Sequence, residues 1–183
     1  MNVMNSLWLE QCRDGDLQAI ERLVSTYQHD VYRLALSIID NPCEAAEVTQ
    51  DVFIRTLRSI DSYQGNASFK TWLFSITINV SRSRLKRIKS RDKLQLILQN
   101  LFYTNKEQEH PEKQVIHDES DSELWRAVNC LDDKHRIPII LRYYHNLPIS
   151  EIADILGKPV GTVHSRLNYA RRQLRSLLKE EQG

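Results

Sequence analysis

The sequence is poor in several features that mark common classes of protein. Its 183 residues include only five glycines and five prolines, and strict apolar–polar alternation is hard to find, which disfavours a β-sheet protein. The three cysteines, Cys12, Cys43 and Cys130, are odd in number and far apart. We therefore expect neither a disulfide framework nor a CxxC zinc site. No apolar run approaches a membrane span, and the N-terminus lacks a signal-peptide pattern, so we expect a cytoplasmic protein without membrane contact of its own.

The charge is nearly balanced overall, but it is distributed in blocks. Residues 1–61 hold 5 basic and 10 acidic side chains, residues 62–93 hold 8 and 1, residues 94–133 hold 3 and 9, and residues 134–183 hold 9 and 4. A uniformly basic nucleic-acid-binding protein is thereby disfavoured. Two basic blocks separated by acidic ones predict two contacts with a polyanion, and they leave acidic surfaces for another kind of partner.

Residues 147–178 predict a helix-turn-helix. A short amphipathic helix should stop at Gly157, and a second helix should begin where Pro159 sets its first turn. On the second helix, apolar residues recur every three or four positions and leave a basic, amide-bearing face on the other side. Such a helix can enter a DNA major groove. A solvated basic face would explain the charges alone, but the tight turn and the preceding helix favour DNA binding.

Two helices are predicted in the N-terminal third of the chain. Asp16 can cap the first, and the run Asn41-Pro42-Cys43-Glu44 starts the second with an Asn cap, a proline at the first helical position and a glutamate placed to close a capping box. The outward face of the second helix carries Glu44, Glu47, Gln50 and Asp51. Either the helix dipole or a binding surface can account for these residues.

A polar loop, residues 61–68, separates these helices from a third helix predicted from residue 69. Its expected buried stripe is Phe69, Trp72, Leu73, Ile76, Val80 and Leu85, with core packing favoured over base stacking for Trp72. Seven basic residues between positions 82 and 93 exceed what the helix C-terminus requires. A basic helix preceded by a polar loop is a reasonable platform for single-stranded nucleic acid.

The remaining segments complete the expected architecture. Residues 94–102 predict an amphipathic extension that either packs back on the first domain or offers a partner-binding stripe, and residues 104–121 predict a polar, acidic linker. We therefore expect an all-α protein of two small helical domains joined by a flexible linker. The boundaries are 1–93, 94–121 for extension and linker, and 122–183 for the helix-turn-helix domain, of the winged-helix-like four-helix kind.

Three stretches together resemble the extracytoplasmic-function group of the sigma-70 family. They are EAAEVTQDVFIRTLRSIDSY, FKTWLFSITINVSRSRLKR, and EIADILGKPVGTVHSRLNYARRQL preceded by LDDKHRIPIILRYYHNLP. The resemblance implies an alternative sigma factor, a non-enzymatic subunit that binds core RNA polymerase and directs it to promoter DNA. The first domain would dock on the β′ clamp helices and read and melt the minus-ten element. The second would read the minus-thirty-five element and meet the β flap, and an anti-sigma factor responding to stress would control the protein.

The resemblance also implies three groups of site residues and no catalytic ones. Core polymerase docking falls to Glu44, Glu47, Gln50, Asp51 and Phe53. The minus-ten loop and helix comprise Ser62, Tyr63, Gln64, Gly65, Asn66, Ala67, Ser68, Asn79, Arg82, Ser83, Lys86 and Arg87. The minus-thirty-five helix comprises Pro159, Gly161, Thr162, His164, Ser165, Arg166, Asn168, Tyr169, Arg171 and Arg172. The sequence departs from the family at Ser83, where Asp is frequent, and at Ile78, where Arg is common. These two departures affect the expected minus-ten DNA sequence more than the expected function.

Two other functions are weighed against this hypothesis. An autonomous helix-turn-helix regulator, with an N-terminal dimerisation or sensing domain, would leave the basic loop-and-helix block unexplained. An enzyme acting on nucleic acid would need a catalytic constellation, but the six histidines are dispersed, and there is no Gly-rich phosphate loop or metal-spaced set. We therefore expect no enzymatic activity and no cofactor or metal.

Overall fold

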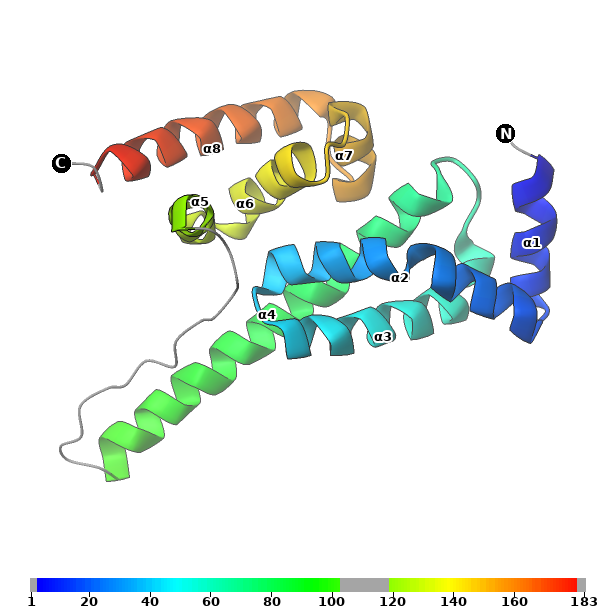
Figure 1. Cartoon of the computed structure of the whole chain (residues 1–183), viewed down its shortest axis with the longest axis horizontal. Coiled ribbons are helices and arrows are strands. Elements are labelled where there is room, and N and C mark those ends of the chain that lie inside the picture. Colours follow the sequence, from blue (N-terminus) through cyan, green and yellow to red (C-terminus); the bar gives the residue numbers. More distant parts are fainter. Residues whose placement is uncertain (1–2, 103–118, 181–183) are drawn as a thin grey trace. The chain divides into compact units, whose positions relative to one another are not determined.

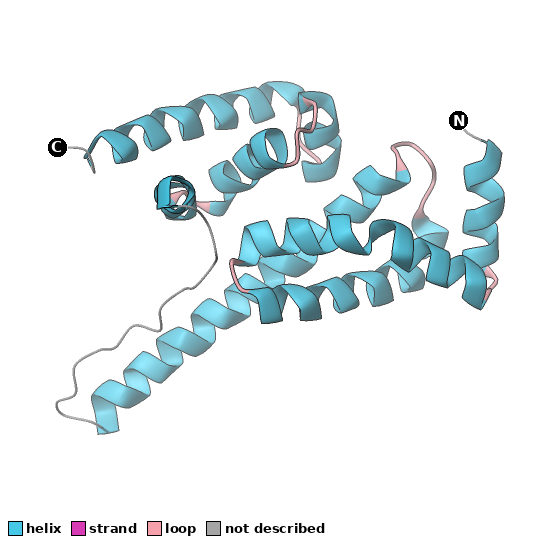
Figure 2. Ribbon diagram, in the orientation of Figure 1, coloured by secondary structure: helices cyan, strands magenta, loops and turns pink. Residues whose placement is uncertain are grey.

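The computed structural model describes residues 3–102 and 119–180. All regular secondary structure in these residues is helical (Figures 1 and 2). The first stretch contains α1 (Val3–Arg13), α2 (Leu17–Ile39), α3 (Pro42–Ser59), the 3-10 turn η1 (Ile60–Ser62) and α4 (Phe69–Phe102). The second contains α5 (Glu119–Cys130), α6 (Asp133–Ile139), the π-helical turn η2 (Ile140–Tyr144), α7 (Ile149–Leu156) and α8 (Val160–Glu180). No strand occurs in either stretch. The all-α prediction is confirmed.

The described chain forms two compact units. Residues 3–66 and 76–102 belong to one, and residues 67–75 and 119–180 belong to the other. None of the helices within residues 3–102 and 119–180 has the length and apolar character of a membrane span.

The first unit is organised by α2 and α3, which pack side by side (Figure 1). Asp16 caps α2, because its carboxylate accepts a hydrogen bond from the Ala19 amide at 2.8 Å. The helix ends at Asp40, whose left-handed conformation, with φ at 57°, directs its amide to the Leu36 carbonyl. Asn41 then caps α3 through the Glu44 amide at 3.0 Å. Both predicted caps are confirmed, and together they set a sharp turn between two long helices.

α4 buries a different stripe from the one predicted. Phe69, Leu73, Val80 and Leu85 are buried as expected, but Trp72 and Ile76 are only half-buried, so the prediction was wrong for these two residues. The buried face instead includes Phe74 and Ile78, and it also contains Thr77 and Ser81, which are fully buried. A hydrophobic pattern does not count threonine and serine as buried positions, so the predicted stripe lies rotated around the helix axis from the observed one. The Trp72 ring lies 5.5 Å from that of Phe69.

The C-terminal half of α4 continues without a break past residue 93. Leu94 and Ile97 are 57% and 47% exposed, so these two side chains do not pack back on the first domain. The other predicted positions of the stripe, Leu98, Leu101 and Phe102, have side chains outside the described set. Most of the predicted linker also lies outside the described residues, although α5 begins within it at Glu119.

The second unit has the four α-helices expected of a helix-turn-helix domain. Asp132 caps α6 through the His135 amide at 3.2 Å. Pro138 lies inside α6, and the chain widens into the π turn η2 directly after it, which fits the loss of a helical donor at proline. The Trp125 ring of α5 meets the Tyr144 ring edge-on at 5.2 Å. Ile137, Leu141 and Ile152 form the fully buried centre.

The turn between α7 and α8 forms as predicted. Gly157 takes the left-handed conformation with φ at 57°, and the amide of Lys158 reaches back to the Ala153 carbonyl at 3.0 Å. Pro159 then accepts hydrogen bonds from the amides of Thr162 and Val163 at 2.9 and 3.2 Å, which starts α8. A glycine at the stop and a proline at the start give this junction its fixed geometry.

Candidate nucleic-acid interfaces and docking helix

α8 presents a basic face backed by an apolar one. Val163, Leu167 and Ala170 are buried, whereas His164 and Asn168 are exposed. Two of the exposed residues are also linked, since the guanidinium of Arg171 donates a hydrogen bond to the Asn168 side-chain carbonyl. A shallow, open hollow on the surface of this helix is lined by Asn168, Arg171, Arg172 and Arg175. Four polar or cationic side chains over two turns suit phosphates and base edges.

The other predicted residues of the minus-thirty-five helix divide by environment. Pro159 and Gly161 are exposed at its start, while Thr162 and Arg166 are half-buried. The Ser165 hydroxyl donates to the Thr162 carbonyl at 3.0 Å. The ring of Tyr169, 42% exposed, stacks on that of His135 in α6 at 4.2 Å. All ten predicted residues therefore lie on α8 or directly before it, and Tyr169 is additionally held by a neighbouring helix.

A second polar face lies on α4. Asn79, Ser83, Lys86 and Arg87 are exposed and Arg82 is half-buried. Their spacing of three and four residues places all five on one side of the helix. The Ser83 hydroxyl is bonded to the Asn79 carbonyl at 2.9 Å. The face joins cations with an amide, which is suited to a sugar–phosphate backbone and an exposed base.

The loop before α4 has distinct ends and an exposed middle. The Ser62 hydroxyl is bonded to the Ser59 carbonyl at 2.6 Å, and Tyr63 is half-buried. Burial raises the pKa of the Tyr63 phenol above its ordinary value. At the other end, Ser68 caps α4, its hydroxyl accepting from the Thr71 amide at 3.0 Å, and Ala67 is half-buried. Gln64, Gly65 and Asn66 are exposed, and Gly65 adopts a left-handed φ of 75°.

The predicted docking residues on α3 do not share one environment. Glu47, Gln50 and Asp51 are exposed. Phe53, however, lies in the core at 7% exposure, so it supports the helix and offers no surface to a partner. Glu44 is also largely covered, with a side chain that is 17% exposed. Fewer acidic side chains of α3 are therefore exposed than predicted from the sequence, because Glu44 is largely covered.

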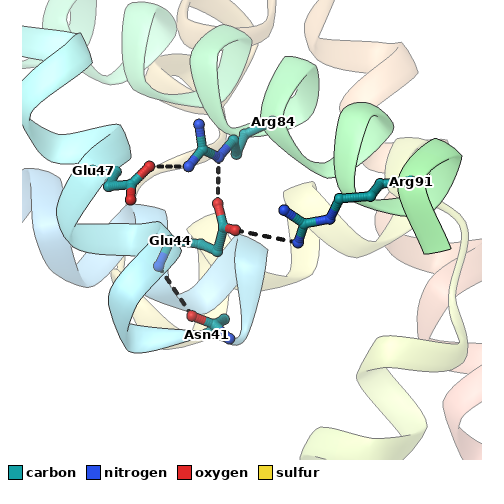
Figure 3. A network of polar contacts seen from close by, with 5 residues as sticks. All are labelled: Asn41, Glu44, Glu47, Arg84 and Arg91. Carbon is teal, nitrogen blue, oxygen red and sulfur yellow. Dashed lines mark hydrogen bonds and ion pairs between the residues drawn. The ribbon is translucent and has the colours of Figure 1, made fainter. Parts of the chain in front are cut away.

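Glu44 is covered because two arginines of α4 reach it, as Figure 3 shows. Arg84 pairs with both Glu44 and Glu47, and Arg91 approaches the other oxygen of Glu44 at 3.6 Å. The Glu44 carboxylate is thus turned toward α4, while the predicted capping box retains its Asn41 half. The hydrogen bond to Glu44 is the main cause that raises the pKa of the Arg84 guanidinium above its ordinary value.

Arg84 and Arg91 were not among the predicted site residues. The sequence offers only a weak signal for them, namely an acidic start on one helix and a basic end on another. Which arginine of the basic run meets Glu44 depends on how α3 and α4 pack. Two hydrogen-bonded charges that are mostly shielded from water hold each other more firmly than an exposed pair does.

Family models of known proteins match a segment in each half of the chain. The family model described as Sigma-70 region 2 matches residues 23–91, and the model described as Sigma-70, region 4 matches residues 127–176. The ECF RNA polymerase sigma factor SigW of Bacillus subtilis is 31% identical, with 98% of this chain and 100% of the relative covered. The ECF RNA polymerase sigma-E factor of Escherichia coli is 32% identical, over 91% and 90% of the two chains.

Two solved structures share the fold. CnrH, in complex with the cytosolic domain of CnrY, superposes with a TM-score of 0.68 at 23% identity, over 95% of this chain and 96% of the other. RpoE from Bartonella quintana, in complex with the anti-sigma factor NepR, gives a TM-score of 0.64 at 23% identity, over 89% and 98%. Taken with the family models and relatives, the chain belongs to the extracytoplasmic-function group of the sigma-70 family of RNA polymerase sigma factors.

Proposed function

We propose that the protein is an alternative sigma factor that binds core RNA polymerase and directs it to promoters with two recognition elements. The observation that carries the proposal is the presence of two separate polar faces, on α4 and on α8, in one chain of this family. The protein acts as a binding subunit in the cytoplasm and has no catalytic role of its own. The chemistry of transcription belongs to the polymerase.

The two faces suit two different forms of DNA. α8 fits the major groove of a duplex at the minus-thirty-five element, where its Arg and Asn side chains meet base edges. The loop 62–68 and the face of α4 fit the minus-ten element once its strands part, because an extruded base needs a pocket and the remaining strand needs cations. Neither face is large, and both gain when the polymerase holds them at fixed spacing.

The exposed residues of α3 are proposed to dock on the β′ clamp helices, and the second unit is proposed to meet the β flap. Glu47, Gln50 and Asp51 are the side chains open to such a partner. An anti-sigma factor is proposed as a further partner. Two structural neighbours have the cytosolic domain of CnrY or the anti-sigma factor NepR bound, which supports the idea that a protein of this fold can be held in such a complex.

Transcription with purified components tests the proposal. The full chain is mixed with core RNA polymerase and a library of genomic fragments, and the start sites are mapped. We expect co-purification with the core and transcripts that depend on the added chain and share two upstream elements. Tight, specific DNA binding without polymerase, together with no dependent transcripts, would instead identify an autonomous helix-turn-helix regulator.

A further inference from the structure

The last residue of α1 holds the start of the loop that precedes α4. The Nη2 atom of Arg13 donates hydrogen bonds to the backbone carbonyls of Tyr63 at 3.1 Å and Ile60 at 3.4 Å. Its Nε atom lies 3.7 Å from a carboxylate oxygen of Asp61. One planar guanidinium thus gathers three acceptors where η1 ends and the loop begins. The Ile60 carbonyl also accepts a hydrogen bond from the Tyr63 backbone amide at 3.2 Å, and one guanidinium can donate to several acceptors at once.

α1 is itself fixed to the rest of the unit. Leu9 and Cys12 are buried at 7% and 4% exposure, and the indole N–H of Trp8 donates to the Ala19 carbonyl in α2 at 3.1 Å. The Trp8 ring stacks on that of Tyr27 at 6.4 Å. The position of Arg13 is therefore determined by core packing. An arginine on a fixed helix can restrain the loop that it contacts.

The side chain of Tyr63, in the same part of the loop, is partly shielded from water. Burial is the main cause that raises the pKa of the Tyr27 phenol in α2, and the electrostatic influence of Tyr63 and Asp30 raises it further. Tyr63 is therefore half-buried, and Arg13 of α1 holds its backbone carbonyl. The residues that follow, Gln64, Gly65 and Asn66, are exposed. The side-chain amide of Asn66 donates a hydrogen bond to the side-chain carbonyl oxygen of Gln64 at 3.3 Å.

We infer that Arg13 is a positioning residue for base capture at the minus-ten element. By fixing Ile60 to Tyr63, it presents the exposed tip 64–66 to an extruded base in one conformation, so that less conformational freedom is lost on binding. The inference rests on the proposed function of the loop. Arg13 lies outside residues 23–91 that match the region 2 model, so neither that match nor the resemblance in sequence assigns it a role.

The test compares two single-stranded oligonucleotides bound by the full chain in complex with core polymerase. One carries the non-template minus-ten sequence of a mapped promoter, and the other has an abasic site at the position that is extruded. The ratio of the two affinities measures base capture alone, since both strands present the same phosphates. Core affinity and thermal unfolding are measured for each variant, so that loss of folding is recognised.

We expect Arg13→Ala to reduce this base preference by about tenfold, as suits the loss of hydrogen bonds from a charged donor, while core affinity is unchanged. Arg13→Lys should give an intermediate ratio, because a lysine keeps the charge but lacks the planar fork. Asp61→Asn should leave the ratio near that of the wild type, since the Asp61 side chain is 86% exposed and such pairs are weak. Arg55→Ala, at an exposed arginine of α3, is the charge-matched control.

Three results would overturn the inference. A folded Arg13→Ala protein with the wild-type base preference would show that the loop needs no such support. Equal weakening of both oligonucleotides would mean that Arg13 contacts phosphate or merely stabilises the fold. If the wild-type protein itself neither binds core polymerase nor yields dependent transcripts, the proposed function fails and the inference fails with it.

Discussion

Arg171 is the clearest single residue with which to test the face of α8. It lies on the exposed side of the helix and is already oriented toward Asn168 by a hydrogen bond. We expect Arg171→Ala to weaken use of the minus-thirty-five element, by about 1–3 kcal/mol if it contacts a base edge. Transcription from promoters with an intact or scrambled upstream element measures the effect.

Core binding provides the internal control for that variant, because α3 is untouched. Gln173→Ala, at another exposed position of α8, is the matched substitution on the same helix. A loss of core affinity in Arg171→Ala would show that this face of α8 contacts polymerase rather than DNA. An effect of equal size on intact and scrambled elements would point to a phosphate contact, which carries no sequence information.

Asp132 predicts a pH dependence in the second unit. Burial alone would raise the pKa of its carboxyl, but the hydrogen bond from Lys134 and the charge and amide of His135 outweigh burial and lower that pKa below its ordinary value. A carboxylate whose pKa is depressed by folding stabilises the protein above the ordinary pKa. Its contribution is lost as the pH falls through the lowered value. We therefore expect a stabilising contribution at neutral pH that disappears in acid.

Thermal unfolding of the wild type and Asp132→Ala, measured at several pH values, checks this expectation. At neutral pH, loss of the cap should cost about 1 kcal/mol. The difference between the two proteins should shrink once the pH is well below the ordinary carboxyl range. A difference that stayed constant down to strongly acidic pH would mean that the charge of Asp132 contributes nothing to capping α6.

At the scale of elements, the contact between the start of α3 and α4 is the one to test. Arg84 and Glu44 have side chains that are 25% and 17% exposed, whereas Glu47 is 62% exposed. Removing one charge of the shielded pair leaves the other without its main partner. Arg84→Gln or Glu44→Gln should therefore destabilise the first unit by about 2 kcal/mol. Glu47→Gln should cost less than about 1 kcal/mol.

A double-mutant cycle separates this coupling from independent effects. Chemical unfolding is measured for Glu44→Gln, Arg84→Gln and the pair together, and the double variant should lose less than the sum. Core affinity is measured in parallel. Glu47→Gln should weaken docking while leaving stability nearly intact, which would separate a surface contact from a structural one. Strict additivity in the cycle would contradict the direct pairing of Glu44 with Arg84.

Features that depend on a few adjacent residues could be predicted from the sequence, whereas contacts between distant residues could not. The caps at Asp16 and Asn41 and the stop at Gly157 depend on a few adjacent residues, and all three were correctly placed. The stripe of α4 was misread, because Thr77 and Ser81 are buried despite their hydroxyls. The roles of Arg13, Arg84 and Arg91 depend on residues about 40 to 50 positions away, and no local pattern records such pairs.

For the whole molecule, the proposed division of DNA recognition between two faces predicts that promoter binding depends on polymerase. Each face alone offers a few cations, and two modest contacts become strong only when they are held together. We expect the free protein to bind promoter duplex weakly and with little sequence preference, and the complex with core polymerase to bind the same duplex tightly and specifically. Titrations of labelled promoter DNA with and without core measure the difference.

The salt dependence of those titrations gives a second readout. Each phosphate contact with a single strand contributes about 0.7 to the slope of log affinity against log salt, so replacing Lys86 or Arg87 should reduce the slope of the polymerase complex by about that amount if each meets a phosphate. Tight, sequence-specific binding by the free chain would contradict the prediction of polymerase dependence.

The placement of the three tryptophans makes the protein its own spectroscopic reporter. Trp8 of α1 stacks on Tyr27 of α2, Trp72 lies beside Phe69 in the first turn of α4, and Trp125 of α5 meets Tyr144. Chains that retain one indole at a time would emit from three separate places. Emission could then show, without any added label, whether added DNA, polymerase or an inhibitor changes the surroundings of α1, of the start of α4 or of α5.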